Sequence, residues 1–237
     1  MGIVLIPTIH DPLQADADHD GLGDRCDPCA YAAIGGAAGW VGKAPNAGHY
    51  AVARLIASGK GAAVITQNVD GLHQRAGAKR VIDLHGRLDR VRCMQCDSKI
   101  TRIRMDELLQ AANPEIRRDS SIEFTPDGDA EIEAAEGFVV PNCPECGGIL
   151  KPDVVFFGES VPQSRVENAM ARLDEADALL VAGTSLTVNS GLRFARRAAR
   201  AGKPIVIVNI GETKADELAT AKIEANTSLV LERLFID

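Results

Sequence analysis

Short, continuous apolar runs alternate with amphipathic stretches along the chain from about residue 40 to its end. Continuous apolar runs flanked by turn residues are typical of strands buried on both faces, and apolar positions at helical spacing are typical of helices. We predict strands over 62–66, 81–84, 178–182 and 205–210. We predict helices over 46–59, 163–175 and 190–201. This order predicts an α/β fold with a Rossmann-like, doubly wound parallel sheet.

Two of the predicted helices carry informative side chains. Asn46 is a candidate N-cap for the first of them, which places three residues on one face: Tyr50, Ala51 and Leu55. The helix over 190–201 directs apolar residues inward and four arginines outward: Arg193, Arg196, Arg197 and Arg200. We interpret these arginines as a solvated helix face rather than an anion site.

Composition narrows the class of protein. With 237 residues, 46% of them hydrophobic, the chain fits one large domain or two small ones and is not disordered. The net charge of -7 argues against a nucleic-acid binder. No apolar run is long enough to span a membrane, and residues 1–6 lack the basic start of a secretory signal. We therefore expect a soluble cytoplasmic protein without membrane or nucleic-acid partners.

The six cysteines form three Cys-x-x-Cys pairs, Cys26/Cys29, Cys93/Cys96 and Cys143/Cys146. Two such pairs separated by a longer insert are the usual arrangement of four thiolates around one structural zinc ion. We assign Cys93, Cys96, Cys143 and Cys146 to a small four-cysteine zinc-binding domain over 93–146, with Gly147 and Gly148 easing the turn around the metal. Reduced cysteines without a metal and a redox pair are the alternatives.

Polar and small residues follow each predicted strand, at 66–70, 84–86, 183–186 and 209–212. In doubly wound sheets, ligands bind beyond the carboxyl ends of the strands, where the strand order reverses. Backbone amides of a Gly-Thr-Ser turn before a helix suit phosphate or ribose oxygens. Together the four segments favour a nucleotide-binding cleft.

Five motifs occur in a fixed order: TQNVDGLH at 66–73, DLHG at 83–86, the four cysteines, KPDVVFFGE at 151–159 and GTSL at 183–186. This set resembles the sirtuins, NAD-dependent protein lysine deacylases, and is most similar to their class II branch. The resemblance covers residues 40–237. It implies a Rossmann-like NAD-binding domain over 40–92 and 147–237, and acylated-lysine proteins or peptides as substrates.

The resemblance also implies roles for individual residues. The acyl group moves from lysine to ADP-ribose with release of nicotinamide, and His85 matches the base that activates a ribose hydroxyl. Asn68 and Asp70 match residues at the nicotinamide and its ribose. The implied NAD-binding set is Gln67, Asn68, Val69, Asp70, Gly183, Thr184, Ser185, Asn209 and Glu212. The implied substrate-binding set is Val155 and Phe157 in the acyl-lysine tunnel, with Gly158 and Glu159 pairing with the substrate backbone. We interpret His73 as structural.

Residues 1–39 form an atypical acidic segment that does not resemble a sirtuin. The family's Gly-Ala-Gly-x-Ser loop and its Pro-Asp-Phe-Arg sequence are absent, and Pro7 stands where that loop should begin. Ile3 to Ile6 could replace the first strand. We expect weakened or absent activity, because this loop covers the NAD pyrophosphate and nicotinamide.

Residues 7–29 instead resemble a thrombospondin type-3 calcium repeat, in which Asp16, Asp18, Asp20 and Asp24 would bind Ca²⁺. A disordered acidic leader is the alternative for this segment. Three other functions stay open: an inactive sirtuin-like zinc protein that binds acyl-peptide or nucleotide, a mono-ADP-ribosyltransferase, and a calcium-binding surface module.

Overall fold

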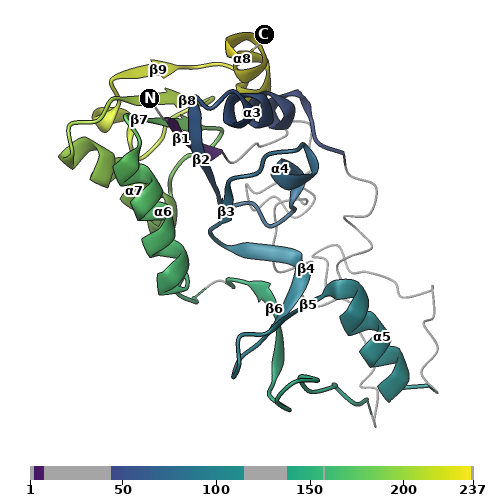
Figure 1. Ribbon diagram of the computed structural model, residues 1–237. Coiled ribbons are helices and arrows are strands. Elements are labelled where there is room, and N and C mark those ends of the chain that lie inside the picture. Colours follow the sequence, from purple (N-terminus) through teal and green to yellow (C-terminus); the bar gives the residue numbers. More distant parts are fainter. Residues whose placement is uncertain (1–2, 8–43, 115–137, 157, 236–237) are drawn as a thin grey trace. The chain divides into compact units, whose positions relative to one another are not determined.

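The computed structural model describes residues 3–7, 44–114, 138–156 and 158–235 (Figure 1). These residues fall into two compact units. The sheet unit comprises 3–7, 44–86 and 158–235, and the cysteine unit comprises 87–114 and 138–156. Among the described residues, no helix combines the length and the apolar character that crossing a bilayer requires.

The sheet unit is built on six parallel strands in the order β3-β2-β1-β7-β8-β9. Their bounds are β1 Ile3–Pro7, β2 Gly61–Thr66, β3 Val81–Asp83, β7 Ala178–Ala182, β8 Ile205–Val208 and β9 Ala221–Ile223. The chain fills the sheet outward from β1 to one edge and then outward from β7 to the other. The order therefore reverses between β1 and β7, which confirms the predicted doubly wound, Rossmann-like sheet.

The first strand comes from the N-terminal residues, as the apolar run at Ile3 to Ile6 suggested. β1 pairs in parallel with β2 on one side and with β7 on the other, so that Ile3 lies opposite both Gly61 and Ala178. Pro7 is the last residue of this strand and lies opposite Ala182. Pro7 therefore ends β1 beside β7, where the strand order reverses.

Helices cover both faces of this sheet (Figure 1). The long ones are α3 Ala47–Ala57, α6 Gln163–Glu175, α7 Asn189–Arg200 and α8 Thr227–Leu234, and two short ones are α4 Leu72–Arg75 and η1 Asp216–Leu218. Val64 belongs to the apolar cluster under α3 and α8, whereas its neighbour Ile65 belongs to the cluster under α6 and α7. Successive side chains of a strand point to opposite faces, so β2 divides its residues between the two cores.

Local signals in the sequence locate most of these elements. Asn46 caps α3 and forms a capping box with His49, and α6 and β7 have the predicted bounds. The prediction that placed Tyr50 on the same face as Ala51 and Leu55 was wrong, because Tyr50 is 45% exposed while the other two are buried. The strand predicted to reach residue 210 ends at Val208.

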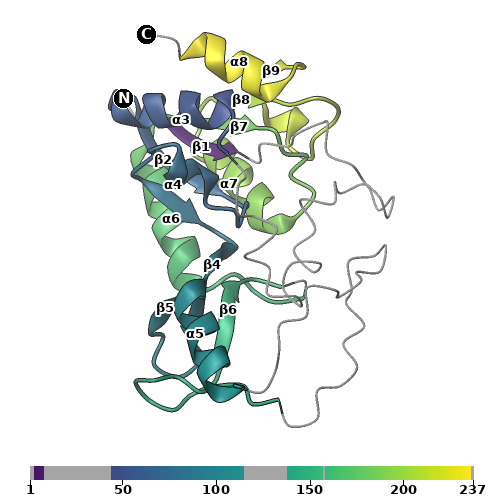
Figure 2. The same ribbon diagram turned by 90° about the vertical axis from the view of Figure 1, so that its right-hand side faces the viewer.

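The cysteine unit has three strands in the order β5-β4-β6 and one helix (Figure 2). Its elements are β4 Gly86–Cys93, β5 Lys99–Thr101, α5 Arg102–Ala112 and β6 Leu150–Val154. Its apolar core is small: the buried members are Val91, Cys93, Met105, Cys143 and Leu150. Two of these five are cysteines, so the unit has little apolar burial of its own to stabilise it. The domain limits at 93 and 146 stay a prediction.

Candidate functional site

The loops at the carboxyl ends of β2, β3, β7 and β8 carry the polar residues that the sequence singled out. Because these strands are parallel, their carboxyl ends meet at one edge of the sheet. The switch in strand order lies at the same edge, which is where ligands of such folds bind. The candidate site therefore lies within the sheet unit.

His85 follows β3 and contacts the first turn of α7. Its Nε2 lies 2.8 Å from the Ser190 hydroxyl, and the Gln67 amide Nε2 lies 3.3 Å from the same hydroxyl. Burial lowers the pKa of His85, and the positive charges of Arg165 and Arg193 lower it further, against a hydrogen bond to the Gln67 backbone that raises it. The ring is therefore neutral at neutral pH and can accept a proton.

The turn after β2 presents Asn68, Val69 and Asp70, all half-buried. The Asn68 N–H donates to the Thr66 hydroxyl at 3.1 Å, and the Leu72 N–H donates to the Asp70 carboxylate at 2.8 Å. Burial raises the pKa of Asp70 and the nearby Asp83 adds to the rise, whereas the hydrogen bond from Leu72 opposes it. These contacts hold the backbone at Asn68 and the direction of the Asp70 carboxylate before any ligand binds.

The turn after β7 holds Gly183, Thr184 and Ser185. Gly183 has a φ of +67°, which an L side chain rarely adopts, and its N–H donates to the Val208 carbonyl at 2.8 Å. The Thr184 hydroxyl is buried and accepts from the Leu186 N–H at 3.1 Å. Ser185 is exposed and can face a ligand, with its hydroxyl 2.7 Å from that of Thr187.

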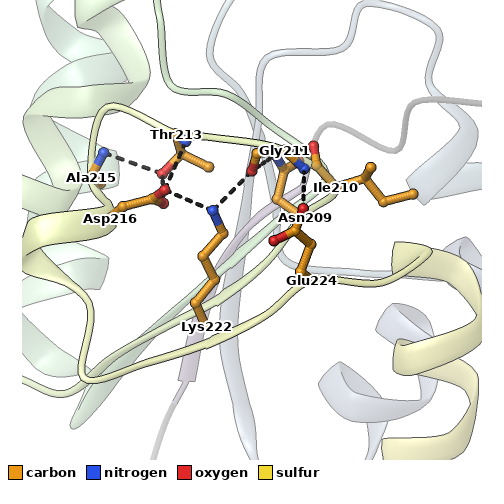
Figure 3. Close-up of polar contacts among 8 residues, drawn as sticks. All are labelled: Asn209, Ile210, Gly211, Thr213, Ala215, Asp216, Lys222 and Glu224. Atoms are coloured by element: carbon orange, nitrogen blue, oxygen red, sulfur yellow. Dashed lines mark hydrogen bonds and ion pairs between the residues drawn. The ribbon is translucent and has the colours of Figure 1, made fainter.

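The loop after β8 is held by a polar network (Figure 3). Lys222 in β9 donates to the Gly211 carbonyl at 2.9 Å and pairs with Asp216 at 2.7 Å. The buried Asn209 side chain donates to the carbonyls of Ile210 and Gly211 at 2.8 and 3.3 Å. This network fixes the segment 209–212 and leaves the predicted ligand residue Glu212 exposed.

The four cysteines of the cysteine unit come together as the sequence predicted. All four sulfurs lie within 4.8 Å of one another, with 3.4 Å between Cys93 and Cys146 and 3.8 Å between Cys96 and Cys143. A zinc ion bound tetrahedrally at about 2.3 Å from each sulfur sets the sulfurs about 3.8 Å apart, so the cluster fits zinc. Gly148 keeps this space open, since a Cβ there would lie 2.9 Å from the Cys93 sulfur.

The neighbouring sulfurs of this cluster also shift the pKa values of one another. Hydrogen bonds from the backbone of Cys96 and Gln95 lower the pKa of Cys93 to about 6. A backbone hydrogen bond from Ser98 lowers the pKa of Cys96, but hydrogen bonds with the neighbouring cysteine sulfurs outweigh it and raise that pKa to about 12. Four adjacent sulfurs thus cannot all be thiolates on their own, and a dication would supply the missing positive charge.

The predicted substrate residues are only partly described. Val155 is half-buried in the cysteine unit, whereas Gly158 and Glu159 are exposed in the sheet unit. Phe157 lies outside the described residues, as do Cys26 and Cys29. The sequence motifs missed two groups of residues that the structure brings to the site: Ser190, and the pair Asp216 and Lys222. Neither group follows a strand end directly, so the strand-end signal could not find them.

Comparison with known proteins adds sequence relatives. A family model described as the Sir2 family matches residues 25–190. A protein named NAD-dependent protein deacetylase from Xanthomonas axonopodis pv. citri is 54% identical over 189 residues, 79% of this chain and 64% of that protein. One of the same name from Bordetella bronchiseptica is 52% identical over 189 residues, 79% of this chain and 69% of that protein. This chain therefore spans less than two thirds of the length of the Xanthomonas relative.

Solved structures agree with these relatives. A structure of Sir2Tm bound to a propionylated peptide matches with a TM-score of 0.70 and 28% identity, over 99% of this chain and 91% of that one. A structure from work on the mechanism and regulation of Sir2 enzymes matches with a TM-score of 0.65 and 31% identity, over 99% and 90% of the two chains.

These matches bear on the acidic N-terminal segment. The family model begins at residue 25, well before residue 40, where the resemblance in the sequence was placed. Asp16, Asp18, Asp20 and Asp24 lie outside the described residues, and none of the similar proteins supports a calcium repeat there. The comparison with a thrombospondin repeat is therefore not retained.

Proposed function

The chain belongs to the Sir2 family, and from this membership we propose that it is an NAD-dependent protein lysine deacylase acting on acylated-lysine proteins or peptides. The observation that carries the proposal is a neutral His85 after the carboxyl end of β3, in contact with the Gln67 backbone and with Ser190 at the start of α7. A propionylated peptide bound to Sir2Tm supports the substrate class.

When bound, NAD would supply the ribose carbon that accepts the acyl oxygen, with nicotinamide as the leaving group. The residues of this chain bind NAD and accept one proton. His85 Nε2 accepts the proton of a ribose hydroxyl, because its lowered pKa keeps the ring neutral. Asp70, fixed by the Leu72 N–H, holds the nicotinamide carboxamide, and Asn68 orients the ribose. Gln67 and Val69 complete this part of the site.

The other two loops hold the rest of the nucleotide. The Gly183–Ser185 turn offers backbone amides and hydroxyls to the phosphates and to the adenosine ribose. Asn209 and Glu212 contact adenosine from the loop that Lys222 fixes. On the substrate side, we propose that Val155 and Phe157 contact the acyl-lysine and that Gly158 and Glu159 pair with the backbone of the substrate.

We also propose that Cys93, Cys96, Cys143 and Cys146 bind one structural zinc ion. Four cysteine ligands close the coordination shell, so this metal stabilises the cysteine unit and takes no part in the reaction. The four cysteines are free rather than paired as disulfides, which suits the reducing cytoplasm where we propose that the protein acts.

The test is release of nicotinamide from NAD by the full chain, with acetyl-, propionyl- and longer acyl-lysine peptides. We expect release that depends on the peptide and falls at least about a hundredfold in His85→Tyr. The matched control is His73→Gln, which changes a histidine that we interpret as structural. Loss of release in both variants to the same degree would contradict a catalytic role for His85.

The alternative functions are separate outcomes of the same assay. Peptide binding with no release from a folded, zinc-loaded sample would indicate an inactive binding protein. Release accompanied by ADP-ribosylated protein and no loss of acyl groups would indicate a mono-ADP-ribosyltransferase. Pro7 favours the inactive binding protein. It has no backbone N–H, and it stands where a glycine-rich loop would begin to supply amide donors.

A further inference from the structure

Ser190 lies beside the proposed base, although no motif in the sequence gave it a role. It is the second residue of α7, and its side chain is buried. Its hydroxyl lies 2.8 Å from His85 Nε2 and 3.3 Å from the amide nitrogen of Gln67. One hydroxyl thus joins the turn after β2, the end of β3 and the start of α7.

The direction of each hydrogen bond follows from the groups involved. The Gln67 amide nitrogen can only donate, so the Ser190 oxygen accepts from it and its own proton is left for His85 Nε2. His85 also forms a hydrogen bond with the Gln67 backbone that raises the pKa of the ring, and a carbonyl acceptor has this effect. Nδ1 is the nitrogen left for this bond. Gln67 therefore contacts both members of the His85–Ser190 pair, His85 through its backbone and Ser190 through its side-chain amide.

The residue after Ser190 shows how closely Gln67 approaches α7. A Cβ on Gly191 would lie 2.8 Å from the Gln67 side-chain oxygen and 3.1 Å from Leu186 Cδ2. A side chain at position 191 would therefore push the Gln67 amide out of its position beside the Ser190 hydroxyl. Ser190 and Gly191 at the start of α7 therefore both support the contact with Gln67. Ser190 forms the hydrogen bonds, and Gly191 leaves space for the Gln67 side chain.

We propose that Ser190 is a positioning residue that fixes His85 as the Nδ1–H tautomer, with the Nε2 lone pair directed to the Ser190 hydroxyl at the start of α7. This inference rests on the proposed function, in which that lone pair accepts a proton from a ribose hydroxyl. The incoming hydroxyl replaces the Ser190 proton as the hydrogen-bond donor to Nε2. Ser190 holds the ring ready until then and does not itself react.

The inference predicts the tautomer of His85 in the protein without any ligand. Two-bond ¹H–¹⁵N NMR spectra of histidine-labelled protein show which ring nitrogen carries the proton, and the His85 signals are those lost in His85→Gln. We expect the Nδ1–H tautomer in the wild-type protein. In Ser190→Ala we expect mixed tautomers and a His85 pKa raised by about 0.5 to 1 unit, because a hydrogen bond to the neutral ring is lost.

Other charges near the ring do not change in this variant. Burial, Arg165 in α6 and Arg193 in α7 still lower the pKa of His85, so a rise reports the lost hydroxyl. The matched control is Ser164→Ala, because Ser164 is also the second residue of a helix in the same unit but is exposed. It should leave the His85 spectrum unchanged. A folded Ser190→Ala with the wild-type tautomer and pKa would overturn the inference, as would an Nε2–H tautomer in the wild type.

The inference also predicts a pattern in the kinetics. Ser190→Ala should lower kcat by about tenfold, less than loss of the base, with the KM for NAD changed by no more than about twofold. The acidic limb of its pH profile should move to higher pH, and Ser190→Thr, which keeps the hydroxyl, should restore both. A rise in KM with an unchanged pH profile would make Ser190 a binding contact and overturn the inference. If the wild-type protein releases no nicotinamide, the proposed function fails, while the NMR measurement on the same protein still decides the role of Ser190.

Discussion

At the scale of single residues, two histidines face each other in the interior of the sheet unit. The rings of His49 in α3 and His73 in α4 lie 4.8 Å apart, and both residues are buried. His49 Nδ1 contacts the backbone and side chain of Asn46, but His49 Nε2 and both ring nitrogens of His73 have no hydrogen-bond partner in the described part of the chain. Protonation of either ring would therefore place a positive charge in the interior without water or hydrogen-bond partners to stabilise it.

This pair predicts how stability depends on pH. Burial lowers the pKa of His49 to about 4 and, together with the charge of His49, that of His73 to about 3. Because the unfolded chain binds protons from about pH 6.5 downward and the folded chain does not, stability should fall with the pH below 6.5. By pH 4.5 each histidine should cost roughly 2 to 3 kcal/mol, measured as the free energy of urea unfolding at each pH.

The control for this prediction is His73→Leu. Leucine removes one of the two titrating rings and puts no polar atom in its place, so the fall in stability between pH 7 and 4.5 should shrink by about half. The comparison is between slopes rather than absolute stabilities, because the variant also changes packing. A variant with the same slope as the wild type, or a wild-type stability that does not change over this range, would show that the pair is not the cause.

At the scale of elements, the cysteine unit depends on a few contacts. Its buried core has five residues, and Cys93 and Cys143 are two of them, so metal binding and core packing involve the same side chains. The buried Asp153 in β6 also forms an ion pair with Arg90 in β4, at 3.4 Å. With so little apolar burial, the free energy of zinc binding would be a large part of the stability of this unit.

Loss of the metal should therefore unfold the cysteine unit. Cys143→Ala, or treatment with a strong zinc chelator, should lower the Tm by about 10 °C or more and abolish the bound zinc. Zinc content and thermal unfolding by circular dichroism measure the two effects. Cys29→Ala is the matched control, because it removes a cysteine that is not one of the four proposed zinc ligands. A Cys143→Ala protein that melts like the wild type would contradict a structural zinc ion.

The elements also show which parts of the fold the sequence predicts. α6 and β7 were predicted with their observed bounds, because apolar spacing and the turn between them are local signals. Tyr50 was misplaced because an aromatic ring can lie at the margin of a helix face, and only packing decides which side it takes. The strand β8 ends at Val208, two residues earlier than predicted, and the side chain of the next residue, Asn209, bonds to carbonyls of the following loop.

In the candidate site, too, some residues could be predicted from the sequence and others could not. The cysteine cluster and His85 were found from motifs whose spacing already implies their chemistry. Ser190 is 105 residues from its partner His85 and belongs to none of the five motifs in the sequence. Lys222 likewise contacts Gly211 from a neighbouring strand, 11 residues on. Contacts between side chains on separate elements depend on how those elements pack, which no single segment of sequence reveals.

At the scale of the whole molecule, the N-terminal residues have the largest structural consequence. Residues 3–7 form a central strand of the sheet, yet the sequence that follows them lacks the glycine-rich loop expected of the family. Among the strands that the structure describes, the two sides of the sheet, β2 with β3 and β7 with β8 and β9, are connected only through β1. This short segment therefore holds together two halves that are far apart in the sequence.

A proline in this strand should disrupt the fold. Leu5→Pro removes a backbone N–H from a strand that has a partner on each side, and proline is tolerated in sheets only at edges, first positions and bulges. We expect at least about 3 kcal/mol of destabilisation, seen as a lower urea midpoint or as insoluble protein. The matched control is Ala221→Pro, at the exposed first residue of the edge strand β9, which should cost much less. If both variants unfold at the same urea concentration, then β1 is not a central strand in solution, and the two sides of the sheet must be joined in another way.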